Sequence, residues 1–594
     1  MGRGNGMRKW IAAVAMFIAA AMLAAALAAC GGSGQGTVGD SGTPITTATE
    51  VAAATTAVAT TATEAAAADG SASGGSDGAA ADVGGKPDPY SFTYYFYWEW
   101  YTLHPWGVDE TSKKWKDQFN IDIEFSKPDA DPEAKLNLMI SSNDLPDVVM
   151  MDRGPVNKRM VELGMLTDLA PLQANNPTYD ENVLKQSQEI MKIDGVLYAL
   201  PCWPRKAASG GNDCWIYDRR IYESAGSPVL KTFEDLYEYA KLVKEKVPVN
   251  NENLPVIPFS VDGQETLHFM TKGFYRSFGG FNGEIYGRVG DELKLTLRDP
   301  KYRDAIMEAN RWYREGLIAD TNFTDSKEQI LEKLVAGRAG LLYYNMDQDD
   351  YNHFRSLLVD SFPDDDYIVL DAPAYPPARG LAPDKIYADS QQTVGDGIVC
   401  ITKKAEQPQR IFDFLSYLYT KDASIEMMYG PKGFIWDELD ANGNPILTKY
   451  EADMTAEEQD DLGMWFWTIP SHSDNVDMTN FAVNAMLPRE KQNWVVWVGA
   501  NIITPLMFVS DEYNGLNEVL DPNSDEGIKK TLCENQRLNM LPRVIMAKTP
   551  EEAEKLYDDL LAFCDDNGMA DVERLLNEKY KENVAMQGYT AYTR

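Results

Sequence analysis

The chain is poor in histidine, in cysteine and in basic side chains. Its 594 residues include four histidines and six cysteines, and 55 basic side chains stand against 91 acidic ones, a formal net charge of −36. A metal site built mainly from histidine is therefore not expected. The charge also argues against a nucleic-acid partner, because phosphate binding needs a local surplus of lysine and arginine.

Long apolar runs and catalytic motifs are equally scarce. Only the N-terminal run Trp10–Ala26 is apolar enough to enter a membrane, which excludes a transporter with several spans. The motifs HExxH, GxSxG and GxxxxGK[ST] are absent. Paired carboxylates could hydrolyse a glycoside, but among 91 acidic residues such a pair carries no signal. We therefore expect neither an enzyme nor a bound metal.

The first ninety residues are typical of an export signal followed by a tether. Arg3, Arg8 and Lys9 precede the apolar run, and Leu27-Ala28-Ala29-Cys30 resembles the lipobox of bacterial lipoproteins. The resemblance implies a signal peptide over residues 1–29 and a lipid on Cys30; a signal peptide with a chance cysteine and an uncleaved anchor are the alternatives. Residues 30–90 are predicted to form a disordered linker, because this Gly/Ser/Thr/Ala-rich stretch buries too little apolar area to offset its chain entropy.

The five remaining cysteines are an odd number, so they cannot all pair. Cys202 and Cys214 are twelve residues apart, and one disulfide between them is an alternative that stays open. We favour buried free thiols, because no CxxC spacing occurs and a free cysteine packs as a small apolar side chain.

Strand and helix patterns alternate along the body. Residues 91–97 and 121–125 are predicted strands, residues 110–119 and 134–140 are predicted helices, and residues 145–152 form a short buried strand. This alternation favours an α/β fold with a mainly parallel sheet. In such sheets, ligands bind at the carboxyl ends of strands.

An ordered set of segments then carries a family resemblance. They are LPDVVMMD (145–152), DGVLYALP (194–201), GRAGLLYYN (337–345), the stretch beginning GDGIVCITKK at 395, and YGPKGFIW (429–436). Together with the lipobox, they resemble the extracellular solute-binding proteins of bacterial ABC importers, and among them the large oligosaccharide-type lipoproteins of Gram-positive bacteria.

The resemblance implies a periplasmic-binding-protein type II fold with two α/β lobes, a hinge and an inter-lobe cleft. The expected lobes are 91–213 plus 386–430, and 214–385 plus 431–594. The implied protein is a monomer on the outer face of the cell membrane, anchored only by its lipid. It captures a carbohydrate by hinge closure, delivers it to an ABC permease and uses no cofactor. The alternatives are a wall-associated polysaccharide hydrolase or lyase, and a sugar adhesin without transport.

Aromatic and polar residues at strand ends and turns are the candidate ligand contacts. Aromatic rings offer rigid apolar surface to the C–H faces of sugars, and carboxylates and arginines make charge-assisted hydrogen bonds to hydroxyls. The aromatic candidates are Trp98, Trp100, Trp203, Tyr344 and Trp436, and the polar candidates are Asp152, Arg205, Asn345, Asp347 and Asp396. For each aromatic candidate the alternative is core packing, and for each polar one a solvated surface charge or helix cap. Arg205 is the residue to expect at an acidic sugar.

Two further patterns are interpreted as structural. The spacing of Trp465, Trp467, Trp494 and Trp497 is more typical of core side chains. Residues 438–443 begin like a calcium loop, but Lys449 stands where a bidentate Glu is required, so an Asn-Gly hairpin is predicted there.

Overall fold

The computed structural model describes residues 88–587 of the chain, with gaps. The gaps are residues 100, 130, 212, 262–265, 281–285, 346–374, 388–389, 396, 451–452, 456–457, 460, 464, 489–490, 517–518 and 522–523. The described residues belong to one compact unit, Val83–Arg594. The predicted signal peptide, Cys30 and the linker up to residue 87 lie outside them. Within the described part, no helix combines the length and apolarity needed to cross a membrane.

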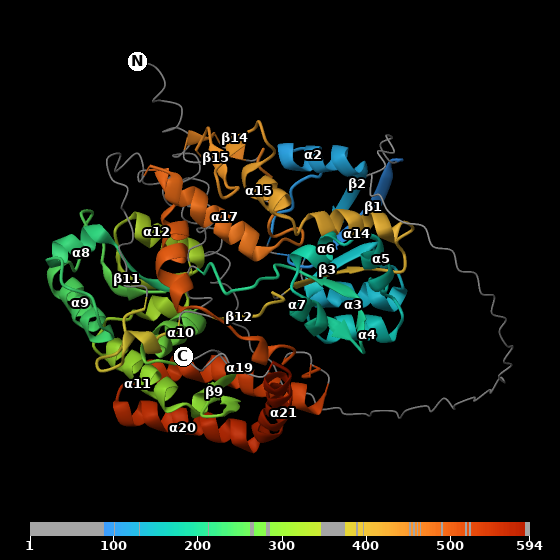
Figure 1. Cartoon of the computed structure of the whole chain (residues 1–594). Coiled ribbons are helices and arrows are strands. Elements are labelled where there is room, and N and C mark those ends of the chain that lie inside the picture. The colour runs from blue at the N-terminus through green and yellow to red at the C-terminus, as the bar shows by residue number, and fades with distance from the viewer. Residues whose placement is uncertain are drawn as a thin grey trace, which may run out of the picture. The chain divides into compact units, whose positions relative to one another are not determined.

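A five-stranded sheet forms the first core (Figure 1). Its strand order is β2-β1-β3-β13-β6; β1, β2 and β3 are parallel, while β13 is antiparallel to both of its neighbours. The predicted mainly parallel sheet is therefore confirmed, with β13 as an antiparallel insertion. The strands are β1 Tyr90–Phe96, β2 Ile121–Ser126, β3 Val148–Asp152, β6 Ala199–Pro201 and β13 Gly397–Ile401.

Helices bury this sheet. The central strands β3 and β13 are almost continuously apolar because helices pack on the sheet and exclude water from it. The helices of this part are α2 Glu110–Phe119, α3 Pro132–Ser142, α4 Pro155–Glu162, α5 Ala170–Asn175, α6 Thr178–Asn182, α7 Lys185–Ile190 and α14 Pro408–Tyr417. The short hairpin β4 Lys192–Ile193 and β5 Val196–Leu197 precedes β6.

A three-stranded sheet organises the second core. Its order is β7-β11-β8, with β11 parallel to β8 and antiparallel to β7. Its strands, with the nearby hairpin β9–β10, are β7 Asp213–Tyr217, β8 Ile257–Ser260, β9 Tyr286–Val289, β10 Glu292–Leu295 and β11 Ala339–Asn345. The helices around it are α8 Arg219–Ala225, α9 Phe233–Lys246, α10 Thr266–Ser277, α11 Pro300–Arg314, α12 Lys327–Val335, α18 Trp494–Val498, α19 Asp525–Ile545, α20 Pro550–Asp566 and α21 Met569–Gln587.

A smaller cluster lies beside the first core. It is built from α15 Lys421–Tyr429, the hairpin β14 Trp436–Leu439 and β15 Pro445–Leu447, and α17 Ser473–Met486. The chain passes from the first core to the second between β6 and β7, returns between Tyr387 and Val394, and passes from the small cluster to the second core between α17 and α18. Within the second of these, β12 Ser390–Gln391 pairs with β16 Phe508–Val509.

Candidate functional site

Four strand termini meet at one edge of the five-stranded sheet. Strands β1, β3 and β6 end there, and the antiparallel β13 begins there, with Gly397 paired to Asp152. Trp98 follows β1 by two residues, and Trp203 follows β6 by two residues. The convergence expected for Trp98, Asp152 and Trp203 is therefore observed.

Trp98 is fixed by a hydrogen bond and by ring contacts. Its indole Nε1 donates to Asp152 Oδ1 at 3.1 Å. The centroid of its ring lies 5.8 Å from that of Trp203, with 32° between the planes. Trp98 is partly exposed, so one part of the indole reaches solvent while the rest packs on the sheet edge.

Trp203 lies deeper than expected. Only 6% of the residue is exposed, and its Nε1 donates to the carbonyl oxygen of Phe466 at 2.9 Å. Its ring also contacts Phe466 at 5.9 Å and Trp467 at 5.1 Å between centroids. Trp203 is thus the centre of an aromatic cluster made of Trp98, Trp203, Phe466 and Trp467.

Trp467 was missed by the sequence interpretation, which treated it as core. It is 42% exposed and meets Trp203 edge-on, with 73° between the ring planes. Trp465, two residues earlier, is fully buried and donates to Asp109 Oδ1 at 3.1 Å. The buried ring anchors the turn that presents Trp467. The run of three aromatic residues at 465–467 held no signal for this difference, because on a strand Trp465 and Trp467 would share one face, whereas here they lie in a turn.

Arg205 holds the segment between β6 and β7, the first of the segments that cross between the cores, against the start of α17. It is 8% exposed, and its Nη2 donates to Ser473 Oγ at 3.1 Å. The backbone N–H of Ser473 donates to Pro204 O at 3.1 Å, and Lys206 N–H donates to Asp474 Oδ2 at 2.7 Å. The guanidinium is therefore largely buried, and its expected role at an acidic sugar stays a prediction.

Two carboxylates of the C-terminal third fasten the crossing segments. Asp477 Oδ2 accepts the Ser209 hydroxyl at 2.7 Å; burial raises the pKa of Asp477, and the charge of Arg205 opposes that rise. Asp511 accepts the backbone N–H of Thr393 at 2.7 Å and its hydroxyl at 2.9 Å. Burial likewise raises the pKa of Asp511, against the lowering by Thr393.

The surroundings of Trp98 are acidic. Burial, followed by the charges of Asp152, Glu133, Asp131 and Glu99, raises the pKa of the neighbouring Tyr97 to about 12. Tyr97 meets Trp98 edge-on, with 6.2 Å between ring centroids. The phenol therefore stays neutral at physiological pH and keeps its proton as a hydrogen-bond donor.

The remaining candidates lie elsewhere or outside the described residues. Trp436 is 8% exposed in the small cluster, where its Nε1 donates to Gly430 O at 2.9 Å; this core position differs from the expected stacking position. Tyr344 and Asn345 lie at the end of β11, paired with Cys214 and Asp213, and their side chains are not described. Trp100, Asp347 and Asp396 fall in the gaps.

The calcium-like segment is a hairpin. Strands β14 and β15 pair around it, and Asp440 Oδ1 accepts the N–H groups of Asn442 and Asn444 at 2.8 Å each. Lys421 Nζ donates to Asn442 O at 3.1 Å and to Asn444 Oδ1 at 3.2 Å. The ammonium group of Lys421 therefore occupies the position beside these oxygens that a bound cation would take. The predicted hairpin is confirmed. Among the described residues, no group of three His, Cys, Asp or Glu side chains could hold a metal ion.

All five described cysteines are buried, and none of them forms a disulfide. The alternative of a Cys202–Cys214 disulfide is therefore not seen. Burial raises the pKa of the Cys400 thiol to about 12, which keeps it protonated and unreactive.

Comparison with known proteins finds a relative of this chain. A fructooligosaccharide ABC transporter substrate-binding protein, FusA of Streptococcus pneumoniae, is 23% identical over 248 residues, which is 39% of this chain and 45% of that protein. The match thus spans less than half the length of this relative.

Solved structures extend the likeness over most of the chain. An HMO-binding solute-binding protein associated with an ABC transporter of Bifidobacterium longum infantis is 16% identical, covers 83% of this chain and 99% of its own, and gives a TM-score of 0.61. The S. pneumoniae FusA complex with kestose is 16% identical, covers 84% of this chain and 100% of its own, and gives 0.60. The alginate-binding protein AlgQ2 is 16% identical, and the match covers 83% of this chain and 98% of AlgQ2 with a TM-score of 0.57. The fold is therefore the periplasmic-binding-protein type II fold, as predicted.

A family model agrees with this assignment. Residues 109–425, more than half of the chain, match the model described as bacterial extracellular solute-binding protein. The family and these relatives are non-catalytic solute-binding proteins. The chain accordingly belongs to the bacterial extracellular solute-binding protein family.

Proposed function

We propose that this protein is the lipid-anchored substrate-binding component of an ABC importer and that it captures a neutral oligosaccharide on the aromatic cluster. The observation that carries the proposal is the position of that cluster. Trp98 and Trp467 leave part of their rings exposed around the buried Trp203, next to the segments that join the two cores. Such rings can stack on the C–H faces of sugar rings.

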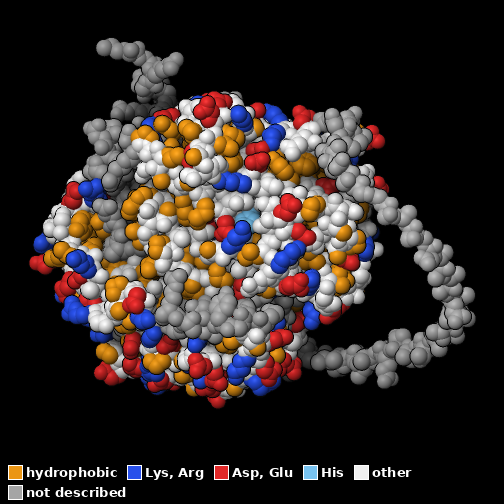
Figure 2. All heavy atoms as spheres, viewed as in Figure 1, with side chains coloured by type: hydrophobic (Ala, Val, Ile, Leu, Met, Phe, Trp, Pro, Cys, Tyr) orange, Lys and Arg blue, Asp and Glu red, His pale blue; other side chains and the backbone are white. Residues whose placement is uncertain are grey.

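Charge favours a neutral ligand over an acidic one. Asp152 accepts a hydrogen bond from Trp98, and burial, followed by the charges of Asp152 and three further carboxylates, raises the pKa of Tyr97 beside it. Arg205, the candidate partner of an acidic sugar, is buried against Ser473. A uronate would therefore meet like charge at this edge. On the face seen in Figure 2, outside the grey atoms, basic side chains are scattered among acidic ones and form no continuous basic patch.

The proposed mechanism is closure of two lobes around the ligand. Trp465 and Ile469 pack in the first core, and α18 to α21 pack in the second. We therefore propose that the chain crosses from one lobe to the other at residues 202–212, 387–396 and 487–493. The third proposed crossing thus lies after residue 486, not at residue 430 as expected from the sequence. A ligand that contacts both lobes binds the closed state more tightly and shifts the population toward it. The closed, monomeric protein would then dock on the membrane permease.

Thermal-shift and calorimetric titrations of the full chain test this function. The panel comprises fructooligosaccharides, neutral milk-type oligosaccharides and oligouronates. A neutral oligosaccharide at 100 times its Kd should add about 2.7 kcal/mol of stability, and the oligouronates should add none. Trp467→Ala should weaken its binding about 30-fold, or about 2 kcal/mol, with little change in ligand-free Tm.

Trp497→Ala is the matched control. Trp497 is also 42% exposed, but it lies on α18, which packs with the second core. Its replacement should leave affinity unchanged. Tight binding of an oligouronate with no response to neutral sugars would refute the ligand class, and equal losses in both variants would refute the site.

A further inference from the structure

Trp203 has a backbone conformation that large side chains seldom adopt. Its φ is +58°, in the left-handed region. The other non-glycine residues with positive φ in the described part are Asn, Asp or Ser, whose short polar side chains tolerate this region better. A bulky residue remains in this region only where its surroundings over-determine it, and such positions cluster at functional sites.

Contacts on both sides of Trp203 hold this conformation. The N–H of Cys202 donates to Gly397 O at 2.7 Å, which ties the preceding residue to β13. The carbonyl oxygen of Trp203 accepts the Ser473 hydroxyl at 3.1 Å, and its indole N–H donates to Phe466 O at 2.9 Å. Main chain and ring are therefore fixed independently.

Two glycines make room for this arrangement. A Cβ on Gly395 would lie 2.0 Å from Cys202 O, and Gly395 itself has a φ of +66°. A Cβ on Gly397 would lie 2.9 Å from Trp98 Cη2 and 3.3 Å from Cys202 Cβ. Gly397 thus lets the six-membered part of the Trp98 indole lie against the start of β13.

We propose that Gly397 is a positioning residue of the carbohydrate site: its missing side chain sets how Trp98 lies against Trp203, and so the shape of the surface that a sugar ring meets. The inference rests on the proposed function for its ligand. The placement of the two indoles, however, is a property of the ligand-free protein and can be measured alone. A glycine needed only for strand packing would affect stability without a specific effect on Trp98.

The test uses full-length Gly397→Ala, Trp98→Phe and the double variant. The first readout is the couplet that the neighbouring indoles of Trp98 and Trp203 produce in the circular-dichroism spectrum of the ligand-free protein. This couplet is identified as the signal that Trp98→Phe removes. Gly397→Ala should remove that couplet and, for the oligosaccharide found above, weaken binding at least tenfold. In the Trp98→Phe background the same substitution should change neither readout further, because phenylalanine lacks the Cη2 atom with which the new methyl group collides.

Gly154→Ala is the matched control, because Gly154 also follows a strand of this edge and a Cβ there would meet no heavy atom within 4 Å. It should keep both couplet and affinity.

A Gly397→Ala protein that keeps the couplet, or whose affinity loss is the same in both backgrounds, overturns the proposal. If Gly397→Ala does not fold, folding of the double variant supports the proposal and failure of both overturns it. If no sugar binds the wild type, the proposed function fails while the couplet still decides the positioning role.

Discussion

Trp203 and Trp467 contact each other, yet their exposures of 6% and 42% give them different energetic roles. A buried indole contributes to the fold through its packing, whereas a half-exposed one has surface left for a ligand.

Trp203→Ala should therefore lower the unfolding free energy by about 3–5 kcal/mol, as for other large buried side chains. Trp467→Ala should lower it by less than about 1 kcal/mol. Urea denaturation of the ligand-free proteins measures both. A small loss in Trp203→Ala would show that the site collapses around the missing ring and that Trp203 is not core.

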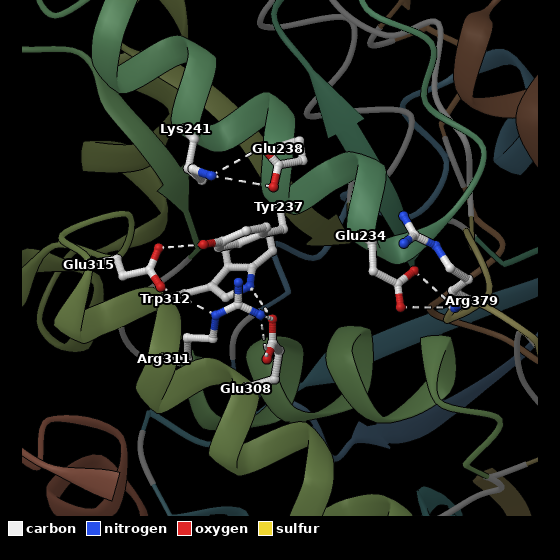
Figure 3. A network of polar contacts seen from close by, with 9 residues as sticks. All are labelled: Glu234, Tyr237, Glu238, Lys241, Glu308, Arg311, Trp312, Glu315 and Arg379. Carbon is white, nitrogen blue, oxygen red and sulfur yellow. Dashed lines mark hydrogen bonds and ion pairs between the residues drawn. The ribbon is translucent and has the colours of Figure 1, made fainter.

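A second prediction at this scale concerns the network on α9 and α11 in Figure 3. The Tyr237 hydroxyl donates to Glu315 Oε2 at 2.5 Å, and Arg311 Nε donates to Glu315 Oε1 at 3.2 Å. Burial alone would raise the pKa of Glu315, but these donors and the charge of Arg311 lower it. A lowered folded-state pKa stabilises the fold above the unfolded pKa of about 4.3.

Glu315→Gln should thus reduce stability at neutral pH, by less than about 1 kcal/mol because the carboxylate is partly exposed. The difference from wild type should disappear as the pH falls through the folded pKa. Urea midpoints from pH 7 to pH 3 provide the measurement. A deficit that grows toward acid would contradict the assigned sign.

At the scale of elements, Glu426 joins α15 to α2. Its Oε2 accepts Trp115 Nε1 at 2.8 Å and the Tyr417 hydroxyl at 2.9 Å, and its Oε1 pairs with Lys114. The carboxylate is buried, so its loss leaves three donors without this acceptor.

Glu426→Ala should cost about 1–3 kcal/mol of stability, the usual range for leaving a buried donor such as the Trp115 indole without its acceptor. Glu110→Ala is the control on α2: its i,i+3 pair with Lys113 is exposed, so its loss should change stability far less than the loss of Glu426. Urea denaturation separates the two. Equal effects would mean that Glu426 does not fasten α15 to α2.

At the scale of the whole molecule, the proposed lipid on Cys30 would hold the protein at the membrane surface. Cys30→Ala should release the protein from membranes or block its processing, because the proposed thioether lipid cannot form. Membrane fractionation and intact mass provide the measurement. A variant that is processed normally and stays membrane-bound would contradict the lipobox assignment.

Local patterns were predictable where short-range physics decides them. The capping box of Thr232 and Asp235 starts α9, and it is a local sequence pattern because both partners lie within one helical turn. The apolar run within residues 145–152 predicted β3, and the Asn-Gly pair predicted the β14–β15 hairpin. The fold class followed from the order of such segments.

Exposure at the site could not be predicted, because it depends on which segments meet. The same aromatic residue type is core at Trp436, which packs within the small cluster, and half-exposed at Trp467, whose neighbour Trp465 takes the buried position. Trp98 and Trp203 were found because they follow strands whose ends must converge in one sheet. Phe466 and Trp467 come from a turn more than 260 residues after Trp203, and no local pattern records that contact.

The sequence by itself determined the elements, the mainly parallel sheet and the family, because periodicity, caps and ordered motifs are properties of neighbouring residues. Only the tertiary structure decided the antiparallel insertion of β13, the burial of Trp203 and Arg205, and the glycine contacts that shape the cluster. These features depend on distances between segments that are far apart in the chain. Packing sets those distances, and composition does not encode them.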